Sequence, residues 1–235
     1  MRTKNTTHQL NGINMNNFDP QKYEKLIENS TDKILQSHMA AEKESINKIF
    51  KYSNATTAVD LGSGYGRLIP HLAFLFHRVI AVELDLKMSS ELQKRFDNAD
   101  DIHIVQDNMI RYLNNSPHEE SCLYLVAQNT LGTIDGSKTD VLDAIGRKLI
   151  NKKSHAVISL FKSSALPTWG SKFYNDIAEM SGPFGNIDTE NSVYKSQSGY
   201  ISHWFTDDEI NSMERNLKRA VYEKVESTEW IVLTF

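Results

Sequence analysis

The sequence predicts a doubly wound α/β domain, in which helices cover both faces of a mainly parallel sheet. Short apolar runs alternate with helical segments over much of the chain, and a glycine-rich loop joins the first run to the next helix. Parallel strands that are buried on both faces have continuous apolar stretches, and helices between them imply right-handed crossovers. This alternation is typical of a doubly wound sheet.

Two segments precede the alternating pattern. Residues 1–18 are polar and rich in asparagine, and we expect a flexible arm there. Residues 19–52 have helical periodicity, with apolar side chains three, four or seven positions apart, and cap residues at 29–32 divide them into two helices. We interpret these helices as an N-terminal helical cap on a single domain that spans 19–235.

The remaining elements follow in order. Apolar runs predict strands at 57–61, 78–84, 102–106, 122–127 and 154–161, and helical spacing occurs at 67–76, 87–96 and 140–150. The segment 163–198 breaks this rhythm, with a helix near 170–180 and turn residues at 181–185, before a short strand at 199–205 and a helix at 207–217. Two strand-like runs, 220–226 and 229–235, close the chain, and a pair joined this tightly is antiparallel.

Composition limits the function. The chain has 235 residues and a net charge of −4, so it lacks the excess of basic over acidic residues that is typical of proteins that bind long nucleic acids. Its single cysteine, Cys122, excludes an internal disulfide and a cysteine-based metal cluster, and it lies in an apolar run where we expect a core residue. The N-terminus lacks the apolar stretch of a secretory signal, and no run is long enough to span a bilayer. We therefore expect a cytoplasmic protein without a membrane partner.

The glycine-rich loop is the most informative motif. It reads Asp60-Leu61-Gly62-Ser63-Gly64-Tyr65-Gly66-Arg67, between the first predicted strand and the next helix. Glycines let the backbone approach a ligand closely, and the helix N-terminus presents free N–H groups. Dinucleotide enzymes favour Gly-x-Gly-x-x-Gly, whereas this loop has Gly-x-Gly-x-Gly with Asp60 before it. That carboxylate would repel a pyrophosphate and attract a cationic sulfonium amino acid, so the charge pattern favours S-adenosylmethionine over a nicotinamide dinucleotide.

Acidic residues end the next two predicted strands. Glu83 follows Gly62 by 21 residues, and a carboxylate at that place can accept both hydrogen bonds of a ribose diol. Asp107 ends the third strand, followed by Asn108 and Met109. An acid or amide there can accept the adenine amino group, while Met109 can lie against the ring.

In order and spacing, the glycine loop, Glu83 and Asp107 resemble the first three cofactor motifs of class I methyltransferases, and the terminal pair resembles that family's closing hairpin. The resemblance implies a Rossmann-like, seven-stranded sheet with its last strand antiparallel, and S-adenosyl-L-methionine as the cofactor. It also implies that Asp60 and its glycines lie at the methionine part, Glu83 at the ribose and Asp107 at the adenine. The cofactor-binding residues that we predict are Tyr23, Asp60, Gly62, Ser63, Gly64, Gly66, Arg67, Glu83, Leu84, Asp107, Asn108, Met109 and Asn129.

Methyl transfer from a sulfonium is an in-line displacement in which the donor carries most of the reactivity. The protein mainly aligns acceptor and methyl, and a general base is needed only if the acceptor arrives protonated. By resemblance, the family's fourth motif follows strand 122–127, which makes Asn129 our candidate for contact with donor or acceptor. The alternative is a structural role as a cap or loop amide.

Two departures argue against methylation of nucleic-acid bases. The stretch 129–132 reads Asn-Thr-Leu-Gly, unlike the Asn/Asp-Pro-Pro-Tyr sequences of adenine methylases. Cys122 lies at the wrong end of its strand to serve as the nucleophile of cytosine C5 methylation.

Metal-dependent methyltransferases need an acidic pair after this strand. Asp135 is the only acidic residue there, so the sequence lacks that pair and we expect no metal.

We interpret 163–198 as the segment that builds the acceptor site. Five aromatic residues there either line that site or belong to the core: Trp169, Phe173, Tyr174, Phe184 and Tyr194. His203 lies in a stretch similar to one in several small-molecule methyltransferases, and it is our candidate for a base or hydrogen-bond partner of the acceptor. Tyr23 would close over the cofactor.

The predicted function is methyl transfer to a nitrogen or oxygen of a small-molecule acceptor, with no nucleic-acid partner. A protein or RNA methyltransferase and a cofactor-binding module without the reaction remain as alternatives.

Overall fold

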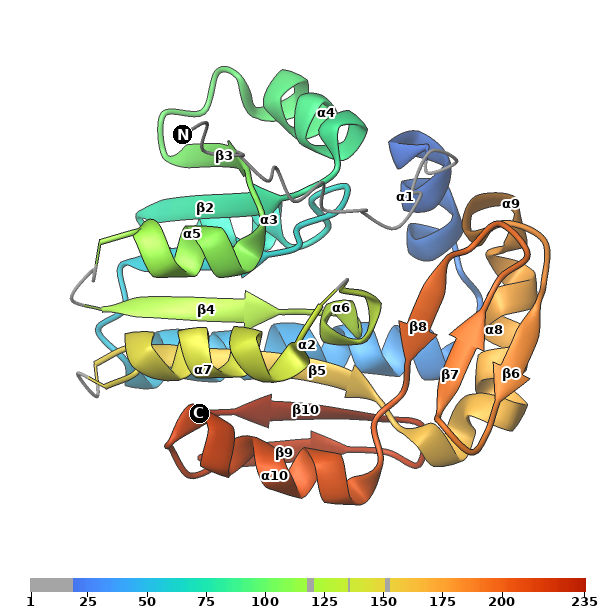
Figure 1. Cartoon of the computed structure of the whole chain (residues 1–235). Helices are drawn as coiled ribbons and strands as arrows, with labels where there is room; N and C mark the ends of the chain where they lie inside the picture. Colours follow the sequence, from blue (N-terminus) through green and yellow to red (C-terminus); the bar gives the residue numbers. More distant parts are fainter. Residues whose placement is uncertain (1–18, 118–120, 135, 151–152) are drawn as a thin grey trace, which may run out of the picture.

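The computed structural model describes residues 19–117, 121–134, 136–150 and 153–235 (Figure 1). The arm predicted at 1–18 lies outside the described residues. The elements are α1 (Pro20–Glu28), α2 (Lys33–Tyr52), β1 (Thr57–Leu61), α3 (Ile69–Leu75), β2 (Arg78–Glu83), α4 (Leu86–Phe96), β3 (Ile102–Gln106), α5 (Met109–Asn115), β4 (Cys122–Val126), α6 (Thr130–Thr133), α7 (Lys138–Lys148), β5 (His155–Phe161), η1 (Ser163–Ala165), η2 (Leu166–Gly170), α8 (Ser171–Asp176), α9 (Ala178–Ser181), β6 (Asn186–Asp188), β7 (Val193–Lys195), β8 (Ile201–His203), α10 (Asp207–Leu217), β9 (Glu223–Glu226) and β10 (Trp230–Thr234).

Seven strands form the main sheet, in the order β3-β2-β1-β4-β5-β10-β9. The first five are parallel to one another, and β10 is antiparallel to both β5 and β9. The predicted doubly wound sheet with its last strand antiparallel is therefore confirmed. Strand order reverses between β1 and β4, and open α/β sheets bind ligands beyond the carboxyl ends of their strands at such a point.

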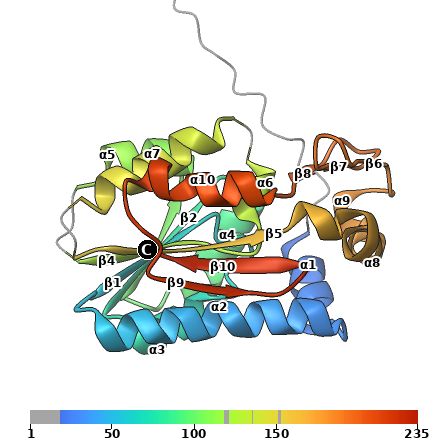
Figure 2. The same cartoon turned by 90° about the horizontal axis from the view of Figure 1, so that it is seen from below.

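Helices cover both faces of the sheet, with α2 and α3 on one side and α5, α7 and α10 on the other (Figure 2). Side chains alternate between the two layers, so that Val79 and Ala81 join one apolar cluster while Ile80 and Val82 join the other. All of β1 is buried, which explains its continuous apolar sequence. Cys122 is buried in the core as expected.

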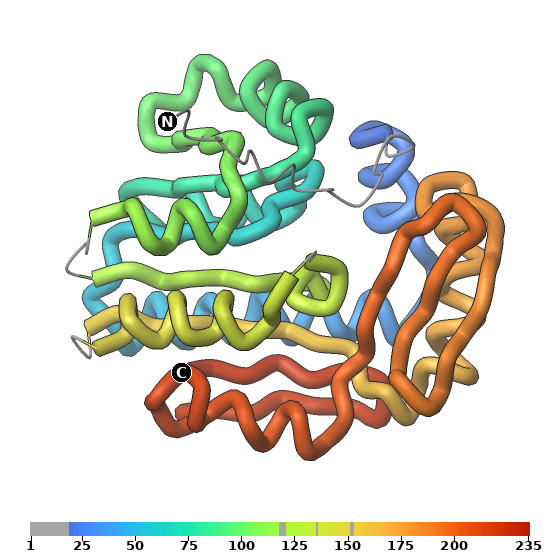
Figure 3. Tube along the Cα trace, in the orientation of Figure 1, coloured from blue at the N-terminus to red at the C-terminus, as the bar shows by residue number. Residues whose placement is uncertain are grey.

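The interpretation of 19–52 as a cap requires a correction for α2. This helix packs along β5 and β10, burying Leu35, Ile46 and Ile49, and so belongs to the covering layer of the sheet. Helix α1 packs against α4, and its Ile27 is buried in the same apolar cluster as Leu35 of α2. Figure 3 shows α1 and the segment 163–198 at the same end of the sheet, and the arrows of Figure 1 show that the parallel strands finish there.

The segment 163–198 contains more structure than its sequence predicted. The expected helix near 170–180 is divided into a π-helical turn, α8 and α9. Strands β6 and β7 pair with β8, which falls within the short strand predicted at 199–205, to form a separate antiparallel sheet. Three-residue strands are too short to show an alternating pattern. The unit is held together by aromatic packing, with the Tyr174 and Tyr194 rings stacked 3.7 Å apart. Among the described helices, none has the length and apolar character needed to cross a membrane.

Candidate functional site

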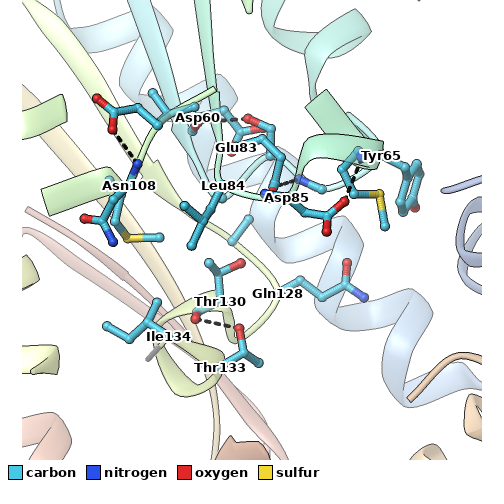
Figure 4. Close-up of a pocket in the computed structure, with 18 of the residues that line it drawn as sticks. Asp60, Tyr65, Glu83, Leu84, Asp85, Asn108, Gln128, Thr130, Thr133 and Ile134 are labelled. Carbon is cyan, nitrogen blue, oxygen red and sulfur yellow. Dashed lines mark hydrogen bonds between the residues drawn. The ribbon is translucent and has the colours of Figure 1, made fainter. Parts of the chain in front are cut away.

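A cavity of about 590 Å³ lies at the carboxyl ends of β1, β2, β3 and β4 (Figure 4). Its volume is in the range of pockets that take small molecules and cofactors. All predicted cofactor-binding residues except Gly66 and Asn129 line it. The structure thus brings together side chains from α1, the glycine loop and the ends of β2 and β3.

The glycine loop approaches the cavity without side chains. Gly64 has a φ of 56°, and the space that a Cβ would occupy there has no atom within 4 Å. A Cβ on Gly62 would lie 2.4 Å from the Cγ2 atom of Thr130, so the loop also passes close to the start of α6. Gly66 has another role, because a Cβ there would collide with Leu92 and Ile69 inside the core. Packing therefore accounts for glycine at this position, which does not line the cavity, and its contact with the cofactor stays a prediction.

Charges of both signs flank this loop. Asp60 is 3% exposed, and burial raises its pKa to about 7, although the Arg67 guanidinium lowers it. The Arg67 side chain is 6% exposed and pairs through Nη2 with Glu42, while its Nη1 is buried without a hydrogen-bond partner. A zwitterionic amino-acid group would find a carboxylate in Asp60 and a guanidinium in Arg67.

Glu83 occupies the end of β2, beside the glycine loop. Its Oε2 accepts a hydrogen bond from the Gly64 N–H at 2.7 Å, and its Oε1 accepts one from the Asp85 N–H at 2.8 Å. Burial raises its pKa, and these backbone bonds lower it. Each carboxylate oxygen keeps a second lone pair, so the pair of oxygens can receive a vicinal diol.

The end of β3 forms the far wall of the cavity. Asn108 caps α5 by accepting hydrogen bonds from Ile110 and Arg111, and its own N–H donates to Asp107 at 2.7 Å. Asp107 also pairs with the Arg111 side chain. The apolar side chains of Leu84 and Leu86 line the same region and are 54% and 62% exposed. A flat heterocycle could lie against them with its polar edge toward Asp107 and Asn108.

Asn129 does not line the cavity. Its Nδ2 donates to the Ser202 hydroxyl at 3.2 Å and to the His203 carbonyl at 3.0 Å, and its Oδ1 accepts from the Phe161 N–H at 3.0 Å. The residue is 1% exposed. Its amide is therefore committed to joining β4, β5 and β8, and we correct its predicted role from contact with donor or acceptor to a structural one.

His203 also lies outside the cavity lining. Its Nε2 is 2.8 Å from the Glu209 Oε1, and its ring packs edge-on against Phe205. The geometry gives no support to its predicted role beside the acceptor. The five aromatic residues of 163–198 do not line the cavity either: Trp169, Phe173, Tyr174 and Tyr194 are buried core, and Phe184 packs against it.

Several lining residues escaped the sequence reasoning. Tyr200, which follows the segment 163–198, lines the cavity together with Gln128 and Thr130 after β4. Tyr65 lies within the glycine loop itself and packs edge-on against Tyr23, with ring centroids 5.2 Å apart. The place of Gln128 at the end of β4 was a usable signal, whereas nothing local marks Tyr200. Within the described residues, no group of three or more His, Cys, Asp or Glu side chains is placed to hold a metal ion.

Comparisons with known proteins extend these observations. No family model matches the chain. Over 81 residues it is 30% identical to "Ribosomal RNA small subunit methyltransferase A" of Acidobacterium capsulatum, and the match spans 34% of this chain but only 29% of that protein.

Solved structures are similar over most of the chain. One is an S-adenosylmethionine-dependent methyltransferase from Clostridium acetobutylicum, with a TM-score of 0.60, 13% identity, and coverage of 91% of this chain and 95% of that one. Another is the 1,6-didemethyltoxoflavin-N1-methyltransferase of Burkholderia thailandensis (TM-score 0.53, 15% identity, 92% and 89% coverage). A third is the N-methyltransferase NodS of Bradyrhizobium japonicum (TM-score 0.52, 12% identity, 84% and 94% coverage).

The sheet order distinguishes this fold from that of dinucleotide enzymes. Their six strands follow the order 3-2-1-4-5-6 and are mostly parallel, whereas here the antiparallel β10 is inserted between β5 and β9. Sheet topology, the residues gathered at its switch point and the similar structures agree: this chain has the class I S-adenosylmethionine-dependent methyltransferase fold.

Proposed function

We propose that this protein is an S-adenosylmethionine-dependent methyltransferase that acts on a nitrogen or oxygen of a small molecule. The observation that carries the proposal is the charge pattern of one cavity. Asp60 and Arg67 supply opposite charges at the glycine loop, and Glu83 supplies a buried carboxylate at the next strand end. These groups complement the ammonium, the carboxylate and the ribose diol of the cofactor.

Two features of the cavity support the fit. The open space beside Gly64 is where any side chain would intrude on a ligand. Arg67 lines the cavity and carries a buried Nη1 atom without a partner. The positive charge of this guanidinium would attract the carboxylate of a ligand in the cavity.

When bound, the cofactor would supply a methyl group on a sulfonium sulfur: the lone pair of the acceptor would form a bond to the methyl carbon while the bond from that carbon to sulfur breaks, and S-adenosylhomocysteine would leave. The residues of this chain bind and orient. Glu83 would hold the ribose, and Asp107 and Asn108 would hold the adenine edge. Tyr23 of α1 and Tyr200, which precedes β8, line the same cavity and would close over the ligand. Burial raises the pKa of Tyr23 to about 12, so its hydroxyl stays neutral and can donate a hydrogen bond.

The nature of the acceptor is supported by two observations. The net charge of −4 gives no basic surplus for a long nucleic acid, and two structurally similar enzymes are named for N-methylation, one of them on a bound small molecule. A second candidate is RNA methylation, which the short similarity to a ribosomal RNA methyltransferase favours.

The test has two stages. Calorimetry should give saturable binding of S-adenosylhomocysteine and none of NAD; the reverse result would refute the proposal. Labelled S-adenosylmethionine is then incubated with the protein and either a metabolite extract or purified ribosomal RNA. Label in a small molecule supports the proposed acceptor class, and label in the RNA supports the second candidate. Binding without any transfer indicates a cofactor-binding module that lacks the reaction.

A further inference from the structure

One buried carboxylate next to the cavity-lining residues forms hydrogen bonds with residues that belong to different sequence motifs. Glu42 lies on α2 and is 1% exposed. Its side chain accepts hydrogen bonds from Arg67, from the Ser159 hydroxyl and, at 2.7 Å, from the backbone N–H of Gln128. Helix α2, the glycine loop, the end of β4 and strand β5 therefore meet at Glu42.

Glu42 is ionised within this environment. Burial by itself would raise its pKa, but the Arg67 guanidinium and the hydrogen bonds from Ser159 and Gln128 help to bring the pKa down to about 2. His38 lies 3.7 Å away, and burial lowers its pKa to about 4, so it is neutral near pH 7. Arg67 is therefore the positive charge that balances Glu42. Burying such an ion pair away from water adds little to the stability of the fold. We therefore infer that the pair has a role in function.

Two of the groups that Glu42 holds belong to cavity-lining residues. Arg67 uses Nη2 for the ion pair and keeps Nη1 without a partner. Gln128 has a φ of 48° and the next residue, Asn129, a φ of 58°. Two consecutive left-handed residues other than glycine are strained, and such strain persists only where neighbouring groups enforce it. Glu42 and Ser159 both bind the Gln128 N–H and so hold the first of these residues.

We propose that Glu42 is a positioning residue of the proposed cofactor site, which fixes the Arg67 guanidinium so that its positive charge faces the carboxylate of the bound amino-acid arm. This inference rests on the proposed function. Through the Gln128 N–H, Glu42 also holds the strained bend after β4 against the same end of the cavity. The consequence is selectivity: ligands with an amino-acid arm depend on Glu42, and ligands that have only the adenosine part do not.

The test compares two ligands that differ in this arm. S-adenosylhomocysteine carries it, whereas 5′-methylthioadenosine has the same adenosine and a thioether but no amino-acid group. The variant Glu42→Gln keeps the shape of the side chain and removes its charge. We expect the Kd for S-adenosylhomocysteine to rise about tenfold and the Kd for 5′-methylthioadenosine to change less than about twofold, since a charge-assisted hydrogen bond is lost for one ligand only.

Glu44→Gln is the matched control, because it makes the same substitution on the same helix at a side chain that is 63% exposed; both affinities should stay as in the wild type. The double variant Glu42→Gln/Arg67→Met removes both buried charges together, which proteins tolerate better than the loss of one. Compared with Arg67→Met alone, it should show no further change in the ratio of the two affinities.

Equal weakening of both ligands by Glu42→Gln, alongside a lowered Tm, would mean that Glu42 only supports the fold. Unchanged affinity for S-adenosylhomocysteine would also overturn the inference. If wild-type protein bound neither ligand, the proposed function itself would fail. Binding of both ligands with an unaltered affinity ratio in Glu42→Gln would refute the positioning role alone.

Discussion

The raised pKa of Asp60 means that the proposed cofactor site lowers the stability of the fold, and this loss of stability can be measured. The carboxyl is buried beneath the glycine loop, and its pKa is about 7 in the folded protein. A carboxyl in an unfolded chain has a pKa of about 3.9. The substitution Asp60→Asn keeps the shape of the side chain and removes its titration.

Proton linkage gives the direction in which the free energy of unfolding changes with pH. Between about pH 4 and pH 7 the folded state binds a proton that the unfolded state has lost, so the contribution of Asp60 to stability falls as pH rises. Above pH 7 the buried carboxyl is ionised, and the loss in the free energy of unfolding that it causes reaches its full value. A difference of about three pKa units corresponds to about 4 kcal/mol as an upper value. Asp60→Asn should therefore raise the free energy of unfolding at pH 8 by up to about 4 kcal/mol, with a smaller gain at lower pH and almost none at pH 4.

Urea denaturation at pH 8, 6.5 and 5 would measure this dependence. Asp100→Asn, at an exposed position, should change the free energy of unfolding by less than about 0.5 kcal/mol at each pH. The same Asp60→Asn protein should bind S-adenosylhomocysteine about tenfold more weakly, because the ligand ammonium loses a charged partner. A gain in stability that is equal at pH 5 and pH 8, or no gain at all, would refute the reasoning.

Three further substitutions test the site. Glu83→Ala should weaken cofactor binding by about 1–3 kcal/mol, since a buried diol would lose its charged partner; unchanged affinity in calorimetry would remove Glu83 from the site. Gly64→Val should abolish binding in a thermal-shift assay, because its side chain would occupy open space in the cavity; normal binding would show that the loop is only a turn. Asn129→Ala should lower the free energy of unfolding by about 3 kcal/mol, because three buried hydrogen bonds are lost. Its Kd for S-adenosylhomocysteine should stay within about threefold, and a large loss of affinity without destabilisation would return Asn129 to the site.

Sequence reasoning succeeded where chemistry and chain order coincide. The strands of the parallel sheet are apolar because both faces are covered, and their carboxyl ends meet at one edge. Acidic and glycine residues placed at those ends must therefore lie close together, and Asp60, Gly64, Glu83 and Asp107 line one cavity.

Sequence reasoning failed where the hydrogen-bond partners of a side chain come from distant segments of the chain. Asn129 and His203 stand at sequence positions that suggest chemistry, yet their side chains bond to β5, β8 and α10. The short strands of the segment before β8 carry no periodic signal, so neither their sheet nor the placement of Tyr200 in the cavity was predictable.

From the sequence alone one can determine the layered α/β fold and the ligand-facing side of its glycine loop, because burial periodicity and strand-end chemistry are local properties. Tertiary structure alone decided which polar groups remain available. Glu42 is 25 residues before Arg67 and 117 before Ser159 in the chain, and no local pattern links them. Only folding brings these groups within hydrogen-bond reach and places Arg67 in the lining of the cavity.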